Sequence, residues 1–291
     1  MFDHLRASSW AGLPEEMRIR QAVLKHKLGM LAISSLHATA HGKGCWTLER
    51  GDRPGRDDLV SVHAILNVIF KKMTLNPAAT RIYLLGVSSG GAFAMILPQL
   101  MQVDGSIIQI MGLPSSILAA TLAEASASPS TSYPPTVFMH MPKDGHVGSL
   151  VESNINDFHM SGFKATQIRR NSVSVTPDYL RSRAPSVFND ELANDIVDKL
   201  DEDGFLDENG FLKADPRLTY KAWTRSVGPL VNESISLVSD SSPLTELLNL
   251  AWAGHEIMSD GVVEALKWLQ APKDVDELKV LEHDNDKSST P

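Results

Sequence analysis

Two spacings of apolar residues alternate along the first 170 residues of the chain. Short apolar runs, which predict buried strands, lie at residues 29–37, 81–87, 105–112, 136–141 and 163–170. Stretches with apolar residues three and four positions apart predict helices at residues 12–29, 57–73, 89–101, 113–125 and 144–162. Strands that alternate with helices are typical of a parallel sheet with helices on both faces. The pattern therefore predicts an α/β fold with a mostly parallel sheet.

Two long uncharged stretches, residues 82–103 and 105–123, are each long enough to span a bilayer. Both contain internal polar and helix-breaking residues, SSGG at 88–91 and GLPSS at 112–116. A buried strand followed by a buried helix accounts for each stretch better, so we expect no membrane span.

The alternation stops at residue 171, and the chain divides there. Residues 171–243 contain short helical patterns and an acidic turn region, which predict a helical cap inserted into the fold. The acidic region lacks the spacing of an EF-hand, because no Glu closes a twelve-residue loop from Asp201 and Gly204 comes too early. We therefore expect residues 1–170 and 244–270 to form the core, and the charged residues 271–291 to form a flexible tail.

Composition narrows the class of protein. Of the 291 residues, 43% are hydrophobic, and the net charge is −8. These values indicate a soluble globular protein and give no electrostatic reason to expect nucleic acid or an anionic membrane as partner. Cys45 is the single cysteine, so an internal disulfide framework is excluded. The first residues lack the apolar stretch of a signal peptide, which favours the cytoplasm unless a targeting segment precedes them.

A G-x-S-x-G motif at residues 86–90 lies between a predicted strand and a predicted helix. That setting is typical of a nucleophile elbow, in which a tight turn presents a serine, here Ser88. Gly86 and Gly90 lack the Cβ atoms that would clash in such a turn, and the Ser89 amide would point at an oxyanion. The alternative is a glycine-rich turn that only packs a helix against a strand.

Two later residues are candidates for the acid and the base that a serine nucleophile needs. Asp144 follows the strand at 136–141, at the sheet edge where catalytic groups collect. His255 lies between an apolar and an amphipathic helical pattern, and the later His283 lies in the charged tail. A loop aspartate and a helix-capping histidine are the alternatives. Glu256 is expected either to cap the next helix or to support the histidine.

Neither a metal nor a cofactor is indicated. His140, Asp144 and His146 lie close in sequence but lack a recognisable spacing of metal ligands. Cys45, beside Trp46, is expected to be a packed small residue, because the sequence indicates no base near it.

Several short motifs together resemble the α/β-hydrolase superfamily, and more narrowly a group of plant, algal and related eukaryotic α/β-hydrolase-like proteins. The motifs are GLPEE at 12–16, MLAISSLH at 30–37, GCW at 44–46, YLLGVSSGGAF at 83–93, FMHMPKD at 138–144, ADPR at 214–217 and HE at 255–256. The resemblance implies a Ser88–Asp144–His255 triad that hydrolyses a small-molecule ester, thioester or amide without a cofactor.

The N-terminal region departs from the superfamily pattern. Members carry strands before the first helix, one of which ends in a His-Gly loop that supplies a second oxyanion amide. No such stretch precedes residues 12–29, and HGKG at 41–44 lies one strand too late. We therefore expect a sheet without its first strands and the Ser89 amide as the remaining oxyanion donor. A non-catalytic α/β-hydrolase-like binding protein, or an inactive shortened form, is the alternative to a serine esterase.

Overall fold

A parallel sheet forms the centre of the molecule. The computed structural model describes residues 12–35, 44–46, 54–76, 79–127, 133–232, 235–271 and 281–282. The strands follow one another in chain order across the sheet, and every neighbouring pair is parallel. They are β1 (Tyr83–Val87), β2 (Gly105–Gln109), β3 (Thr136–His140), β4 (Ala165–Arg169) and the two-residue β5 (Leu281–Glu282). The predicted α/β class with a parallel sheet is confirmed.

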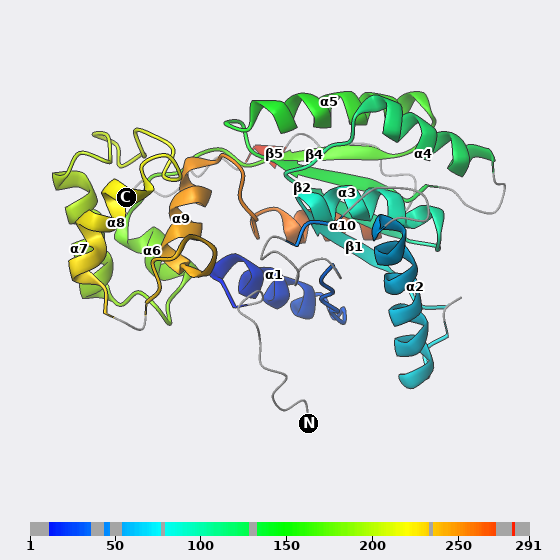
Figure 1. The fold of residues 1–291 in the computed structure, drawn as a ribbon, viewed down its shortest axis with the longest axis horizontal. Coiled ribbons are helices and arrows are strands. Elements are labelled where there is room, and N and C mark those ends of the chain that lie inside the picture. Colours follow the sequence, from blue (N-terminus) through cyan, green and yellow to red (C-terminus); the bar gives the residue numbers. More distant parts are fainter. Residues whose placement is uncertain are drawn as a thin grey trace.

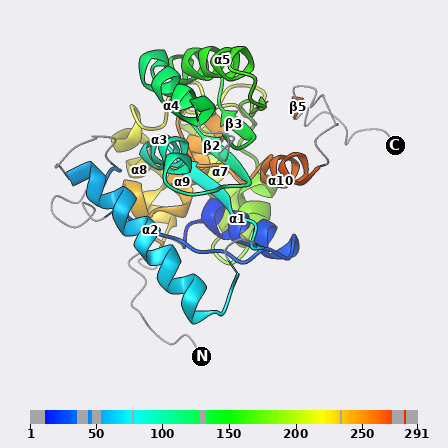
Figure 2. The same cartoon turned by 90° about the vertical axis from the view of Figure 1, so that its right-hand side faces the viewer.

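Helices cover both faces because the central strands are apolar on both. All residues of β2 and β3 are buried. Ile107 and Val137 belong to one core cluster, whereas their neighbours Ile108 and Phe138 belong to another. The first cluster lies under α1 (Pro14–Lys25) and α10 (Val262–Gln270), and the second under α3 (Ser89–Ile96), α4 (Ser115–Ala127) and α5 (Gly145–Met160). Seen along the strands, α4 and α5 lie on one side and α1 and α10 on the other (Figure 2).

A further helix, α2 (Pro54–Lys72), packs against α3 and against Leu84 of β1. Val62 forms a small apolar cluster with Phe93 and with Leu97 of the short 3-10 helix η2 (Leu97–Gln99). Much of the remaining surface of α2 is exposed, including Val60 and Val68.

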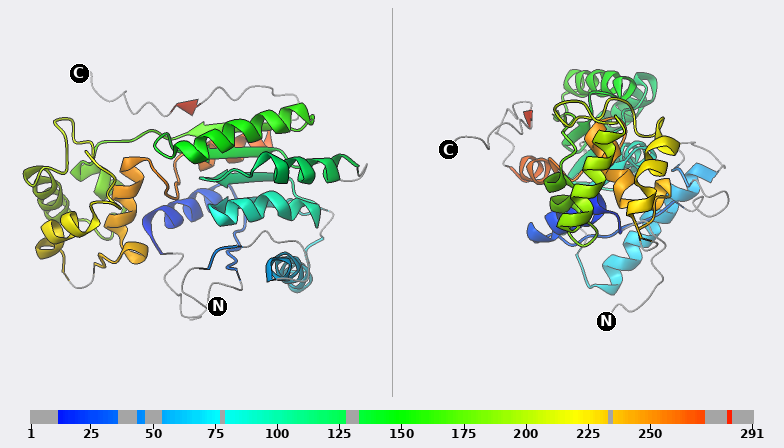
Figure 3. Two further views of the ribbon diagram at one scale, coloured as in Figure 1. Left: turned by 45° about the horizontal axis from the view of Figure 1, so that its top comes forward. Right: turned by 90° about the vertical axis from the view of Figure 1, so that its left-hand side faces the viewer.

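The segment that interrupts the alternation forms a separate group of helices. It contains α6 (Pro177–Arg183), α7 (Asp190–Glu202), α8 (Tyr220–Val227) and the 3-10 helices η3 (Gly228–Leu230) and η4 (Ser239–Ser241). Figures 1 and 3 show α6, α7 and α8 together at one end of the molecule, with α9 (Pro243–Trp252) between them and the sheet. No helix within the described residues is both long and apolar enough to cross a membrane.

The strand expected at residues 29–37 is not formed over residues 29–35, and residues 36 and 37 lie outside the described part. Ile33 packs against the cluster between α2 and α3, and the Ser35 hydroxyl donates to Asp58 at 2.9 Å. Met30 and Leu31 are about half exposed, at 48% each. Side-chain contacts therefore hold this segment in place of the backbone pairing that its apolar character suggested.

The C-terminal tail is described only in part. Leu281 and Glu282 pair with Ile168 and Arg169 of β4. Residues 272–280 and 283–291, which include His283, lie outside the described part, as do residues 41–43 of the HGKG stretch.

Candidate active site

Ser88 occupies a strained turn between β1 and α3. Its backbone has φ 52° and ψ −121°, a positive-φ conformation that is uncommon for a residue with a side chain. Its N–H donates to the carbonyl of Gln109 at 3.0 Å, and its own carbonyl accepts from Gly91 and Ala92. Such conformations cost about 1–3 kcal/mol and are held only where the surrounding structure enforces them.

The two motif glycines contribute unequally to this turn. A Cβ on Gly86 would lie 2.2 Å from the carbonyl oxygen of Gly90, so the turn excludes any side chain there. A Cβ on Gly90 would meet the indole nitrogen of Trp46 at 3.4 Å, which is an ordinary contact. The expected clash is therefore found at Gly86 and not at Gly90.

Asp144 follows β3 and begins α5 as its N-cap residue. One carboxylate oxygen, Oδ1, accepts from the Val147 N–H at 3.2 Å, which satisfies a donor of the first helical turn. The other oxygen, Oδ2, lies 2.5 Å from Nδ1 of His255. The same carboxylate thus holds the helix end and faces the imidazole.

His255 lies in the loop between α9 and α10, and its ring bridges the other two candidates. Its Nε2 lies 3.2 Å from Oγ of Ser88, and its side chain is 43% exposed. The three residues come from segments that are distant in sequence. The structure therefore brings Ser88, His255 and Asp144 into one hydrogen-bonded row at the carboxyl edge of the sheet.

Gln109, whose role its position in the sequence does not reveal, links the serine to residues 253–261, the histidine loop between α9 and α10. It is fully buried at the end of β2, and its backbone carbonyl accepts from Ser88. Its side-chain amide donates to the Met258 carbonyl at 2.8 Å and accepts from the Met258 N–H at 3.0 Å. An amide within the otherwise apolar run SIIQIM was the one signal available in the sequence.

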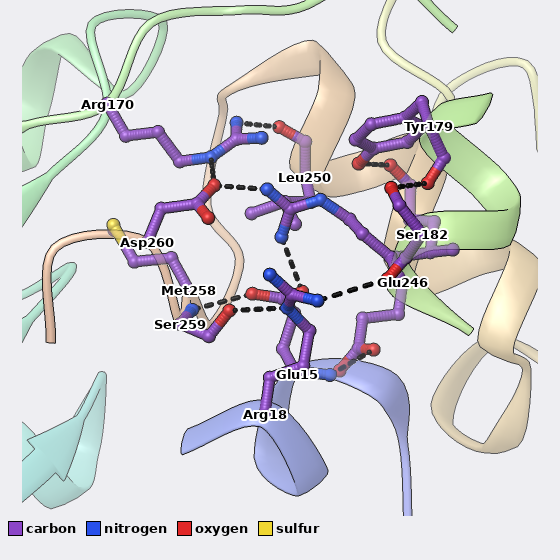
Figure 4. Close-up of polar contacts among 12 residues, drawn as sticks. Glu15, Arg18, Arg170, Tyr179, Ser182, Glu246, Leu250, Met258, Ser259 and Asp260 are labelled. Atoms are coloured by element: carbon purple, nitrogen blue, oxygen red, sulfur yellow. Dashed lines mark hydrogen bonds and ion pairs between the residues drawn. The ribbon is translucent and has the colours of Figure 1, made fainter. Parts of the chain in front are cut away.

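Buried charges fasten the next part of the histidine loop (Figure 4). The Ser259 N–H donates to Glu15 of α1 at 2.6 Å, and Glu15 also accepts from Arg183 at 2.6 Å. Asp260 accepts from Arg183 and, at 2.8 Å, from Arg170. These four charged residues join α1, α6 and the end of β4 to the loop. Nothing in their sequence spacing indicates that they meet.

The electrostatics of this cluster differ from one carboxylate to the next. Burial opposes ionisation of Asp260, yet Arg183 and Arg170 together hold its pKa below the ordinary value. Glu246 accepts from the Glu15 N–H at 3.0 Å but has no such ion pair among the described residues. Burial, aided by neighbouring carboxylates, raises the pKa of Glu246 to about 9. Glu246 is therefore neutral near pH 7.

Ser89 begins α3, so its N–H is one of those that have no acceptor within the helix. The short segment at residues 44–46 lies beside it. The Trp46 N–H donates to the Ser89 hydroxyl at 3.2 Å, and the Trp46 ring stacks on Phe93 with ring centres 4.1 Å apart. The GCW motif therefore lies against the elbow, although residues 44–46 themselves form no strand.

The remaining candidates do not form a second site. His140 pairs with Gln167 at 2.8 Å, and burial lowers its pKa. Within the described residues, no three His, Cys, Asp or Glu side chains are arranged to hold a metal ion. Cys45 is exposed. Comparisons of this chain with protein-family models, with curated proteins and with solved structures give no match.

Proposed function

We propose that this chain is a serine hydrolase of the α/β-hydrolase class that cleaves a carboxyl ester, or a related thioester or amide, of a small molecule. The observation that carries the proposal is the row from Ser88 Oγ to His255 Nε2, at 3.2 Å, and from His255 Nδ1 to Asp144, at 2.5 Å. The strained backbone of Ser88, placed where a strand gives way to a helix, supports it further.

In the first step, His255 Nε2 takes the proton of the Ser88 hydroxyl while Oγ forms a bond to the acyl carbon. The carbonyl oxygen of the substrate becomes an oxyanion, which the Ser89 N–H at the start of α3 stabilises. The Asp144 carboxylate accepts a hydrogen bond from the Nδ1–H of His255, which fixes the tautomer of the ring and stabilises its charged form.

In the second step, the oxyanion collapses and the bond to the leaving alcohol breaks, with His255 donating its proton to that oxygen. Water then enters, His255 takes one of its protons, and the hydroxide attacks the acyl-enzyme. The carboxylic acid leaves as Ser88 regains its proton from His255. No cofactor takes part in this sequence of steps, and the helices of residues 171–243 form the cap over the site.

Labelling with a fluorophosphonate probe tests this proposal directly, since the probe reacts with activated serines and requires no knowledge of the substrate. We expect the wild-type protein to be labelled, Ser88→Ala to be unlabelled, and Ser115→Ala, an exposed serine of α4, to be labelled like the wild type. A folded wild-type protein that resists labelling would refute the proposal and favour a non-catalytic binding protein with this fold.

A further inference from the structure

The turn that carries His255 has no helix to define its conformation. Residues 253–261 connect α9 to α10 without regular structure, and the His255 side chain is 43% exposed. Packing alone therefore does little to fix the ring. The position of the ring depends on what holds the backbone on either side of it.

Hydrogen bonds from other segments of the chain hold both ends of this turn. Before the histidine, the Lys143 N–H donates to the Ala253 carbonyl at 3.1 Å. After it, Gln109 holds Met258 through both backbone groups, and Glu15 accepts from Ser259. These contacts leave the segment formed by His255 and Glu256 as the central part of the turn.

Arg217, from the inserted segment, contacts that central part. Its Nη2 donates to the backbone carbonyl of His255 and to the Glu256 carboxylate, the latter at 3.0 Å. Glu256 also accepts from Asn249 at 3.0 Å, and its side chain is only 19% exposed. The arginine therefore has two acceptors on two successive residues, one of which is the candidate base.

The arginine is itself held firmly by the inserted segment. Its backbone N–H donates to the Asp215 carboxylate at 2.8 Å. The adjacent Pro216 carbonyl accepts from the indole of Trp223 at 2.9 Å, and Trp223 of α8 is buried. Because this turn is bonded to α8, the position of α8 helps to determine where Arg217 meets the backbone of His255.

We infer that Arg217 is a positioning residue through which the cap segment, residues 171–243, holds His255 within hydrogen-bonding distance of Ser88 and Asp144. This inference rests on the proposed function. It gives residues 171–243 a part in catalysis beyond covering the site, because a displacement of the base of about 1 Å can cost on the order of 100-fold in rate.

The test compares Arg217→Met, Arg217→Lys and Arg225→Met for fluorophosphonate labelling and for hydrolysis of p-nitrophenyl butyrate. We expect Arg217→Met to lower kcat by about 10- to 100-fold with KM unchanged. Arg217→Lys keeps the charge, but the lysine side chain is shorter and its ammonium falls short of the position from which Nη2 serves both acceptors, so this variant should recover only part of the loss. Arg225, an exposed arginine of α8, serves as the control and should behave like the wild type.

A wild-type kcat in folded Arg217→Met, or a change in KM alone, would overturn the inference while leaving the proposed function intact. A wild-type protein that is neither labelled nor active would instead refute the proposed function. If Arg217→Met does not fold, the folded Arg217→Lys variant decides, and wild-type turnover in that variant overturns the inference.

Discussion

The unequal roles of Gly86 and Gly90 make a prediction that needs no substrate. In Gly86→Ala the new Cβ would lie 2.2 Å from the Gly90 carbonyl oxygen, 2.6 Å from its carbon and 2.8 Å from the Gly91 Cα. Real Cβ atoms essentially never approach closer than 3.0 Å, so the shortfall at the oxygen is 3.0 − 2.2 = 0.8 Å. All three obstructing atoms are backbone. No side-chain rotation relieves the clash, and β1 and α3 must separate.

Overpacking of a close-packed site costs about 1–3 kcal/mol and sometimes more, and a backbone obstruction belongs at the upper end of that range. Gly86→Ala should therefore lower the free energy of unfolding by about 3 kcal/mol. Gly90→Ala places its Cβ in ordinary contact with Trp46, within α3, where alanine is favoured over glycine by up to ~1 kcal/mol. This variant should be as stable as the wild type or slightly more stable.

Urea unfolding of both variants, followed by circular dichroism, measures this difference. With a denaturant dependence of about 1–3 kcal/mol per molar urea, the midpoints of the two variants should differ by roughly 1 M or more. A Gly86→Ala protein that unfolds at the wild-type midpoint would show that β1 and α3 are not as close as the structure has them. Equal losses in both variants would show that any side chain near Ser88 is rejected, and not specifically one at Gly86.

Two further variants test the buried charges. Arg183→Met removes the closer of the two arginines paired with the fully buried Glu15, since Arg18 lies 3.8 Å away, and should lower the free energy of unfolding by about 3–5 kcal/mol. Arg181→Met, at an exposed pair, should not move the urea midpoint, and equal midpoints for the two variants would contradict this. Burial raises the pKa of Glu246 from 4.5 to about 9, so between these pH values the folded chain keeps a proton that the unfolded chain releases, and stability falls as pH rises. Glu246→Gln has no carboxyl group to ionise, so it should lose less stability than the wild type as pH rises. The urea midpoint of the variant minus that of the wild type should therefore increase from pH 5 to pH 9. A difference that stays constant with pH would refute the raised pKa of Glu246.

The sequence predicted the parts of the fold that depend on the local spacing of apolar residues. The alternation of strands and helices from residue 81 to residue 170 follows from apolar spacing, and the structure confirms it. Ser88, Asp144 and His255 can be predicted as candidates because each follows a recognisable strand or helix pattern in the sequence. The structure brings them together, although their catalytic roles remain a proposal.

Other features depend on which residues meet across the fold. Residues 29–35 have the apolar character of a strand, yet they are held by Ile33 and Ser35 side chains, which no local spacing reveals. Glu15 and Arg183 resemble surface charges in the sequence, and only burial against each other distinguishes them. Gln109 acts through both its backbone and its side chain because β2 lies beside β1, so its role follows from topology and not from pattern.

The two carboxylate oxygens of Asp144 make separate contacts, and this affects how such a site would change during evolution. Most catalytic groups are liabilities for stability, and a lineage that no longer needs the chemistry gains by discarding them. Asp144, the proposed acid, would differ, because its Oδ1 caps α5 and an N-cap is worth about 1 kcal/mol. A descendant without activity would still benefit from this aspartate, whereas it would gain by replacing Ser88, whose backbone is strained, with glycine. Among relatives of this chain, retention of the serine is therefore the more informative mark of a working enzyme.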